Sequence, residues 1–182
     1  MSDETKIKVA MADAFGVILI GWIAFMMAFV FFDQYGLSFM VGGLSGIVGI
    51  ALAAVTIMAF LNDNLFGTAL FGPLAVFFYV FPTVIADTPE AVSTLILFMG
   101  VYLLVMGIIS LAQPVRMVTI VLFVAAIALI LVGYWWIDGG ETLKTLSGVF
   151  LALLGIFASY LGLAIVTNTV KGDMVLPLLV KG

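Results

Sequence analysis

Six long apolar blocks are the feature that most limits how this chain can fold. A helix needs about 20 mainly apolar residues to cross a bilayer, and short polar stretches divide the sequence into runs of roughly that length. The runs are continuous and do not alternate between apolar and polar residues, which disfavours a transmembrane barrel. The sequence therefore predicts an all-α integral membrane bundle, a single membrane domain over residues 1–182, with six transmembrane helices at about 9–32, 37–60, 65–86, 91–112, 115–137 and 146–170.

The composition agrees with a membrane protein and excludes several kinds of chemistry. Hydrophobic residues make up 65% of the chain and charged residues 9%, and the mean hydropathy is +1.39. The sequence has no histidine and no cysteine, which removes most zinc sites, imidazole-based triads and thiol nucleophiles. It also has no lysine and arginine cluster that could bind phosphates. We therefore expect no enzyme, no cofactor, no metal and no nucleic-acid partner, but a lipid bilayer and a small-molecule solute.

The positions of the cations predict how the bundle is oriented. Cytoplasmic loops of membrane proteins carry an excess of lysine and arginine. In the predicted arrangement Lys144 lies on one side of the membrane, and the other side holds Lys6, Lys8, Arg116, Lys171 and Lys181. Both termini are therefore expected to be cytoplasmic, in a multi-pass protein of the plasma (inner) membrane.

Asp13 is the one charged residue within the predicted spans that calls for a separate explanation. It lies about one turn into the first apolar block. A carboxylate near the amino end of a helix is favoured by the helix dipole, so Asp13 is explained if it lies at the cytoplasmic interface. Ionisable residues deeper in a membrane mark ion or proton pathways, so a proton-linked or gating role is the alternative.

The third block contains a proline that disturbs its own helix. Pro73 cannot donate a backbone hydrogen bond, so the carbonyl near Ala69 loses its partner, and Gly67 and Gly72 let the backbone bend or pack closely. A freed carbonyl at membrane depth either lines a cavity or only marks a packing kink. The bend at Gly72-Pro73 is expected to place Leu74, with Phe71 nearby, at an apolar constriction on a solute path.

Several short motifs, in order along the chain, resemble those of the acetate uptake transporter family. They are Asn64-x-Phe66-Gly67-x-x-x-Phe71, Phe98-x-Gly100-Val101-Tyr102-Leu103, Gly155-x-x-x-x-Tyr160-Leu161 and Gly172-x-x-Val175-Leu176-Pro177. This resemblance identifies the chain as a divergent member of a family of six-helix plasma-membrane proteins. It implies transport of acetate, or in some members succinate, and assembly as a homo-oligomer, a hexamer. Small residues on helix faces would allow the close contacts that such an assembly needs.

The chain departs from the family where a carboxylate would be held. An Asn-Pro signature of the family is replaced by residues 11–17, which read Met-Ala-Asp-Ala-Phe-Gly-Val. Gly72-Pro73-Leu74 stands where members have Thr-Ser-Tyr, and Ile165 stands where they have a glutamate in the last span. These departures weaken the assignment of the solute more than the assignment of the fold.

The resemblance also places the family's narrow apolar gates near Ile20, Leu74 and Ala125, of which the first two are bulky here. The first functional hypothesis is a transporter or channel for a small monocarboxylate, with acetate as the first choice, moved as the protonated acid or with a proton. The alternatives are a channel for a small neutral solute, such as an amide, an alcohol or a gas, and a structural membrane assembly protein.

Overall fold

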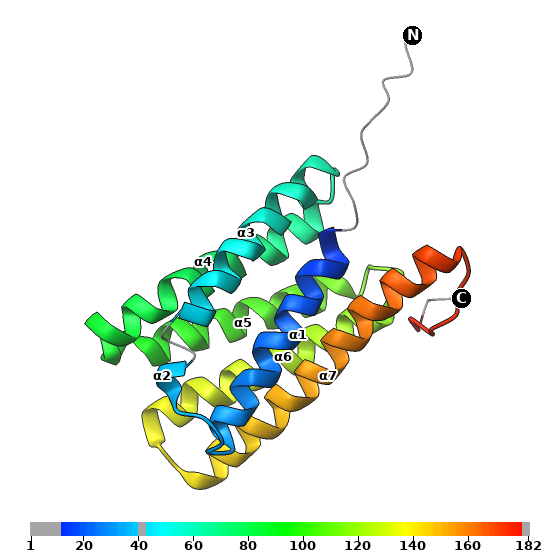
Figure 1. The fold of residues 1–182 in the computed structure, drawn as a ribbon. Coiled ribbons are helices and arrows are strands. Elements are labelled where there is room, and N and C mark those ends of the chain that lie inside the picture. Colours follow the sequence, from blue (N-terminus) through cyan, green and yellow to red (C-terminus); the bar gives the residue numbers. More distant parts are fainter. Residues whose placement is uncertain (1–11, 40–42, 180–182) are drawn as a thin grey trace.

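The protein is a bundle of long helices, seen in a computed structural model that describes residues 12–39 and 43–179 (Figure 1). The start of the predicted first span, residues 9–11, and the cations Lys6, Lys8 and Lys181 lie outside the described residues. The helices are α1 (Ala12–Phe31), α2 (Leu37–Phe39), α3 (Ser45–Leu61), α4 (Leu65–Asp87), the 3-10 helix η2 (Pro89–Ala91), α5 (Val92–Ser110), α6 (Arg116–Asp138) and α7 (Glu141–Lys171).

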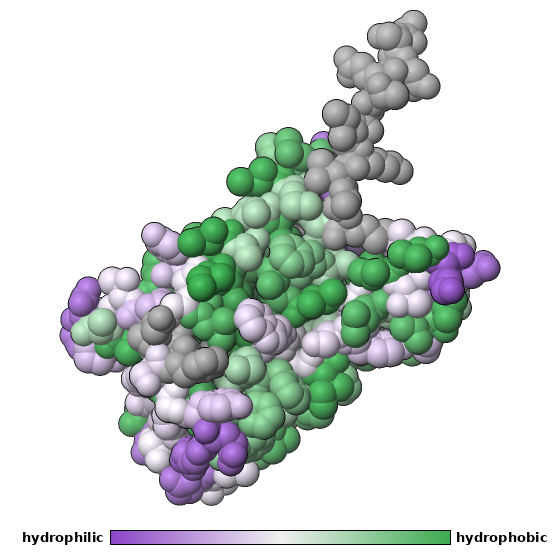
Figure 2. Space-filling model, viewed as in Figure 1, coloured by the Kyte–Doolittle hydropathy of each residue, from purple (hydrophilic) through white to green (hydrophobic). Residues whose placement is uncertain are grey.

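The predicted all-α membrane fold is confirmed. Within the described ranges, α1, α4, α5 together with η2, α6 and α7 are long and apolar enough to cross a membrane. Figure 2 shows apolar side chains along the visible flank of the bundle and polar side chains gathered at its ends. An apolar belt between two polar ends is the surface that a bilayer requires. The chain is therefore a multi-pass membrane protein.

Two helices differ in their bounds from the predicted spans. The second span was expected to be one helix over residues 37–60. The structure describes α2 (Leu37–Phe39) and α3, of 17 residues from Ser45, and residues 40–42 between them lie outside the described ranges. Gly43 has a φ of +140°, which no residue within an α-helix adopts, so a continuous helix is interrupted there. The last helix begins earlier than predicted, at Glu141, because an acidic side chain in the first turn is favoured by the helix dipole.

The first and last long helices close the bundle by packing against each other. A Cβ atom built on Gly21 of α1 would lie 2.8 Å from the backbone nitrogen of Ser159 on α7, and one built on Gly155 would lie 3.1 Å from the carbonyl oxygen of Gly21. Small residues let two membrane helices bring their backbones this close. The glycines of α7 therefore serve contacts within the chain.

Helices α3 and α4 meet in the same way at Gly49. A Cβ atom there would lie 2.6 Å from the backbone nitrogen of Tyr79 and 2.9 Å from the carbonyl oxygen of Ala75. A Cβ atom on Gly46, one turn earlier in α3, would meet no atom of the described residues within 4 Å. The two glycines of one helix thus differ completely in their surroundings.

The segment after α7 folds back onto the bundle. Asn168 donates its side-chain amide to the carbonyl oxygen of Leu176 at 2.8 Å, and the Tyr160 hydroxyl donates to that of Pro177 at 2.9 Å. The carbonyl oxygen of Leu179 accepts from the backbone nitrogen of Arg116 at 3.0 Å, which satisfies one of the free N–H groups at the start of α6. The segment after α7 is therefore held against α7 through Leu176 and Pro177 and against α6 through Leu179. Tyr160, Leu176 and Pro177 belong to the motifs that resemble those of the transporter family.

The bundle has two ends that can be named by their charged residues. The start of α1 and the end of α7 lie together at one end, which we call the Asp13 end (Figure 1). The opposite end holds the turn after α1 and the start of α7, where Lys144 forms an ion pair with Asp33. We call it the Lys144 end.

Candidate functional site

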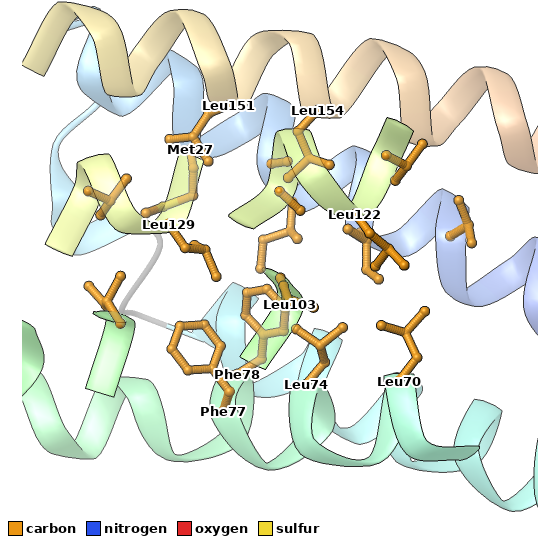
Figure 3. A pocket seen from close by; sticks show the side chains of 18 of the residues that line it. Met27, Leu70, Leu74, Phe77, Phe78, Leu103, Leu122, Leu129, Leu151 and Leu154 are labelled. Carbon is orange, nitrogen blue, oxygen red and sulfur yellow. The ribbon is translucent and has the colours of Figure 1, made fainter. Parts of the chain in front are cut away.

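A cavity occupies the middle of the bundle, between all six long helices (Figure 3). Its volume is about 80 Å³, counted as the space open to the centres of water molecules. On that scale a single water needs about 10–15 Å³, so the cavity has room for a small solute. The lining residues are Val17, Ile20, Ile23, Ala24 and Met27 of α1, Ser45 of α3, Leu70, Leu74, Phe77, Phe78 and Phe81 of α4, Ile96 and Leu103 of α5, Val118, Val121, Leu122, Ala125, Leu129 and Val132 of α6, and Leu151, Leu154 and Leu161 of α7.

The wall of this central cavity is almost wholly apolar. Ser45 is the one polar residue of the described lining, and its hydroxyl donates to the carbonyl oxygen of Phe78 at 2.7 Å. No charged side chain of the described residues lies in the wall. A charged solute would lose its hydration here without compensation, whereas a neutral one would lose much less.

Three of the predicted gate residues lie on the wall of the central cavity. Ile20 comes from α1, Leu74 from α4 and Ala125 from α6, and the last two are buried. Figure 3 shows Leu74 beside Leu70 and Phe77 on one face of α4, directed towards the facing helices. The structure thus brings together three positions that are far apart in the sequence. Their role as a gate stays a prediction.

The other predicted path residues lie outside the cavity wall. Phe71 is buried against α1, where a Cβ atom on Gly16 would lie 2.6 Å from its Cε1 atom. Gly72 faces α3, with its position for a Cβ atom 3.4 Å from Cγ2 of Thr56. The residues of α4 that line the cavity recur at helical spacing, beginning with Leu70. Phe71 is the next residue, so its side chain leaves the helix about 100° away from that of Leu70. Phe66 is partly buried against the core and Pro73 lies within α4, both away from the wall.

The carbonyl that Pro73 frees already has a partner. The hydroxyl of Tyr102, on α5, donates to the carbonyl oxygen of Ala69. The expectation that this carbonyl could line a cavity is therefore replaced by a hydrogen bond between two helices. Tyr102 was noticed in the sequence only as part of a motif, and its distance of 33 residues from Ala69 gave no sign of the contact.

A second proline of α4 repeats the arrangement. Pro82 removes the helical donor from the carbonyl of Phe78, and this is the carbonyl that accepts the hydrogen bond from Ser45. The hydrogen bond of Ser45 to the carbonyl freed by Pro82 was not predicted from the sequence. Each proline of α4 thus leaves one carbonyl without a helical partner, and a hydroxyl of a neighbouring helix satisfies each of them. These two bonds fix α4, which carries Leu74, against α5 and α3.

We expect Tyr102→Phe to destabilise the bundle because the carbonyl of Ala69 would be left buried without a donor. The cost of such an orphaned group is about 1–3 kcal/mol of the free energy of unfolding. The measurement is thermal and denaturant unfolding in detergent. Tyr79→Phe removes the same hydroxyl from a side chain that is 61% exposed and serves as the matched control. Equal stability of the two variants would contradict the role given to Tyr102.

At the Asp13 end, a polar cluster joins α1 to the start of α4. Asn64 caps α4 by accepting a hydrogen bond from the backbone nitrogen of Gly67 at 2.9 Å, and its amide nitrogen donates to Oδ2 of Asp13 at 2.6 Å. The other carboxylate oxygen, Oδ1, is buried and has no hydrogen-bond partner in the part of the chain that the structure describes. A Cβ atom on Gly67 would lie 2.6 Å from it. Asp13 is thus bound to a second helix, a contact that the sequence analysis did not predict.

Comparison with known proteins identifies the fold. The solved structure of the bacterial acetate channel SatP superposes on the chain with a TM-score of 0.86 at 19% sequence identity, over 93% of this chain and 99% of that one. No protein-family model matches the sequence, and neither does any curated protein. At this identity the similarity shows the fold alone. The six-helix architecture implied by the motifs is confirmed, and the chain has the fold of a bacterial acetate channel.

Proposed function

We propose that the chain is a transporter or channel for a small monocarboxylate, acetate in the first place, which crosses as the protonated acid or together with a proton. The observation that carries the proposal is the apolar central cavity, enclosed by all six long helices of a fold that a bacterial acetate channel shares. Ile20, Leu74 and Ala125 on its wall are the proposed gate.

An apolar cavity selects the neutral form of a weak acid. A carboxylic acid with a pKa near 4.3 is about 0.2% neutral at pH 7, about 6% at pH 5.5 and about 0.06% at pH 7.5. The charged form would have to enter the cavity without its water, which costs several kcal/mol or more. Uptake that follows the neutral form therefore rises about a hundredfold between pH 7.5 and pH 5.5 at constant total acetate.

Labelled acetate uptake into vesicles that contain the purified protein tests this function at the two pH values. Protein-free vesicles of the same lipid supply the background, because neutral acids also cross lipid directly. Protein-dependent uptake that is larger at pH 5.5 is the expected result. Uptake equal to that of the protein-free vesicles at both pH values would refute acetate transport and leave a neutral-solute channel and a structural assembly protein as the two alternatives.

A neutral solute is the second candidate, since the described cavity wall carries no charged group and its one hydroxyl is already bonded to a carbonyl. An amide, an alcohol or a gas would need no proton. Protein-dependent passage of such a solute at a rate independent of pH, together with no acetate uptake, would favour this candidate over the first.

The location and assembly of the protein are part of the proposal. We place it in the plasma (inner) membrane with both termini cytoplasmic, because Arg116 and Lys171 lie at the Asp13 end and Lys144 lies at the other end. We propose a homo-oligomer, a hexamer by the resemblance. The empty space beside Gly46 supports a contact between subunits at this face of α3.

Asp13 is proposed as a proton-linked or gating group at the cytoplasmic end. Its carboxylate lies half buried between α1 and α4, with one oxygen bound to Asn64 and the other without a partner among residues 12–39 and 43–179. Groups that exchange protons in membrane proteins are placed in such partly buried polar contacts.

A further inference from the structure

A second, smaller cavity lies at the Lys144 end of the bundle. Its volume is about 40 Å³ on the same scale as the central one. The two cavities share Met27, Phe81 and Val132 in their walls, so they are neighbours along the axis of the bundle. Lys144 is the one charged residue of the described wall of this second cavity, which we call the outer cavity.

Lys144 holds a carboxylate at the mouth of the outer cavity. Its Nζ atom lies 2.7 Å from each carboxylate oxygen of Asp33, and the side chain of Lys144 is 18% exposed while that of Asp33 is 75% exposed. Lys144 also lies near the start of α7, where the helix dipole adds partial positive charge. Most of the Lys144 side chain is thus packed against the bundle, and the carboxylate bound to its ammonium belongs to an exposed turn.

One turn further along α7 lies a buried hydroxyl with an unused hydrogen-bonding capacity. Ser147 is 0% exposed, and its Oγ atom has no hydrogen-bond partner among the described residues. By helical spacing Ser147 lies on the same face as Leu151 and Leu154, which line the central cavity. Along α7 it lies between Lys144, which lines the outer cavity, and Leu151, which lines the central cavity, and it is itself just behind the described walls of both.

We propose that Lys144 and Ser147 form a carboxylate capture site through which the solute passes from the outer cavity to the central cavity. The inference rests on the proposed monocarboxylate transport. Asp33 is the internal carboxylate that occupies Lys144 in the absence of solute, and a solute carboxylate displaces it. Ser147, whose hydroxyl has no partner among the described residues, supplies a further hydrogen bond to the solute one turn inward from Lys144.

The capture site and the apolar cavity prefer opposite forms of the solute, so the anion has to be neutralised between them. Lys144 attracts the anion. When the solute leaves Lys144 and its carboxylate accepts a proton from hydronium of the acidic solution, releasing a water molecule, the charge that Lys144 attracts is lost, and Asp33 again binds the ammonium. The neutral acid is the form that the central cavity accepts.

The test compares charge-matched variants at the two ends of α7. Lys144→Met and Lys171→Met each remove one cation, and initial acetate uptake is measured against acetate concentration. We expect Lys144→Met to raise the half-saturating concentration about tenfold, the equivalent of one charged hydrogen bond. Lys171→Met is expected to stay within about twofold of the wild type, as for an exposed charge. Because the chain has no cysteine, a cysteine at Thr88 with an impermeant thiol reagent reports which end faces out.

A second pair of variants acts on the competing carboxylate. Asp33→Asn removes the carboxylate bound at 2.7 Å, whereas Glu141→Gln removes an equal charge whose oxygen lies 4.0 Å from the same Nζ atom. Asp33→Asn is expected to lower the half-saturating concentration severalfold and Glu141→Gln to leave it unchanged. Ser147→Ala is expected to raise it about threefold, as one neutral hydrogen bond is lost.

Acetate binding in detergent separates this inference from the transport function. Added acetate should raise the melting temperature of the wild type and of Lys171→Met, but not of Lys144→Met. Binding that depends on Lys144 without any uptake would overturn the transport function and support the capture site. The capture site is overturned if the Lys144 and Lys171 variants have equal half-saturating concentrations. If Lys144→Met does not fold, the second pair of variants decides. Equal half-saturating acetate concentrations of Asp33→Asn and Glu141→Gln would then overturn the capture site.

Discussion

Replacing Ala125 with phenylalanine is expected to reduce uptake per folded molecule by about tenfold or more, because it raises the barrier for passage by at least 1.4 kcal/mol. Ala125 lies on the wall of the central cavity opposite α4, so an aromatic ring there fills the space through which a solute must pass. The measurement is labelled acetate uptake at pH 5.5, corrected for the amount of folded protein. Ile127→Phe, on the outward face of the same helix at 41% exposure, is the control.

Leu74→Ala should have the opposite effect on rate. Removal of the leucine side chain widens the cavity at a predicted constriction, so solute passes faster and selection weakens. Truncation of a buried leucine to alanine lowers the free energy of unfolding by about 2–5 kcal/mol wherever it lies. Leu52→Ala on α3 is the control, because Leu52 is buried but does not line the cavity. A Leu74→Ala protein with the stability loss of Leu52→Ala and an unchanged rate of acetate uptake would show that Leu74 only packs.

For the first variant, an Ala125→Phe protein whose acetate uptake equals that of the wild type would place the solute path outside the central cavity.

The architecture could be predicted from the sequence because bilayer length and continuous apolar runs leave few choices. The break at Gly43 was not predicted, since a glycine-rich apolar run has the hydropathy of a continuous helix, and the positive φ of Gly43 is what shows the break. The freed carbonyl of Ala69 was predicted from Pro73 because its cause is local.

The partners of the site residues could not be predicted in the same way. Tyr102 and Ala69 are 33 residues apart, and Lys144 and Asp33 are 111 residues apart. Which side chains meet across a bundle depends on the rotation of each helix about its axis, and nearly uniform apolar helices carry little information on that rotation. The resemblance supplied Ile20, Leu74 and Ala125, whereas Asp13 and Asn64 were noticed separately and their bond was not.

Gly49→Ala is expected to lower the free energy of unfolding by about 1–3 kcal/mol or more, the cost of forcing an extra methyl into a filled contact. The methyl would lie 2.6 Å from the backbone nitrogen of Tyr79, and backbone atoms of a helix cannot move aside as a side chain does. The two helices must therefore separate. Thermal unfolding in detergent measures the loss.

Separation of α3 and α4 in Gly49→Ala should also change the central cavity. Ser45 lies one turn before Gly49 and bonds the carbonyl of Phe78, next to Tyr79, so widening this contact stretches the bond that satisfies the carbonyl freed by Pro82. Ser45 and Phe78 both line the central cavity, and uptake by the surviving folded protein should be altered along with stability.

Gly46→Ala is the control on the same helix, because no described atom lies within 4 Å of the new methyl and alanine is the better helix former by about 0.5–1 kcal/mol. A stable Gly46→Ala chain whose mass in mild detergent falls from oligomer to monomer would place a subunit contact at this face of α3, as proposed. If Gly49→Ala unfolds at the same temperature as the wild type, the backbones of α3 and α4 do not meet at Gly49.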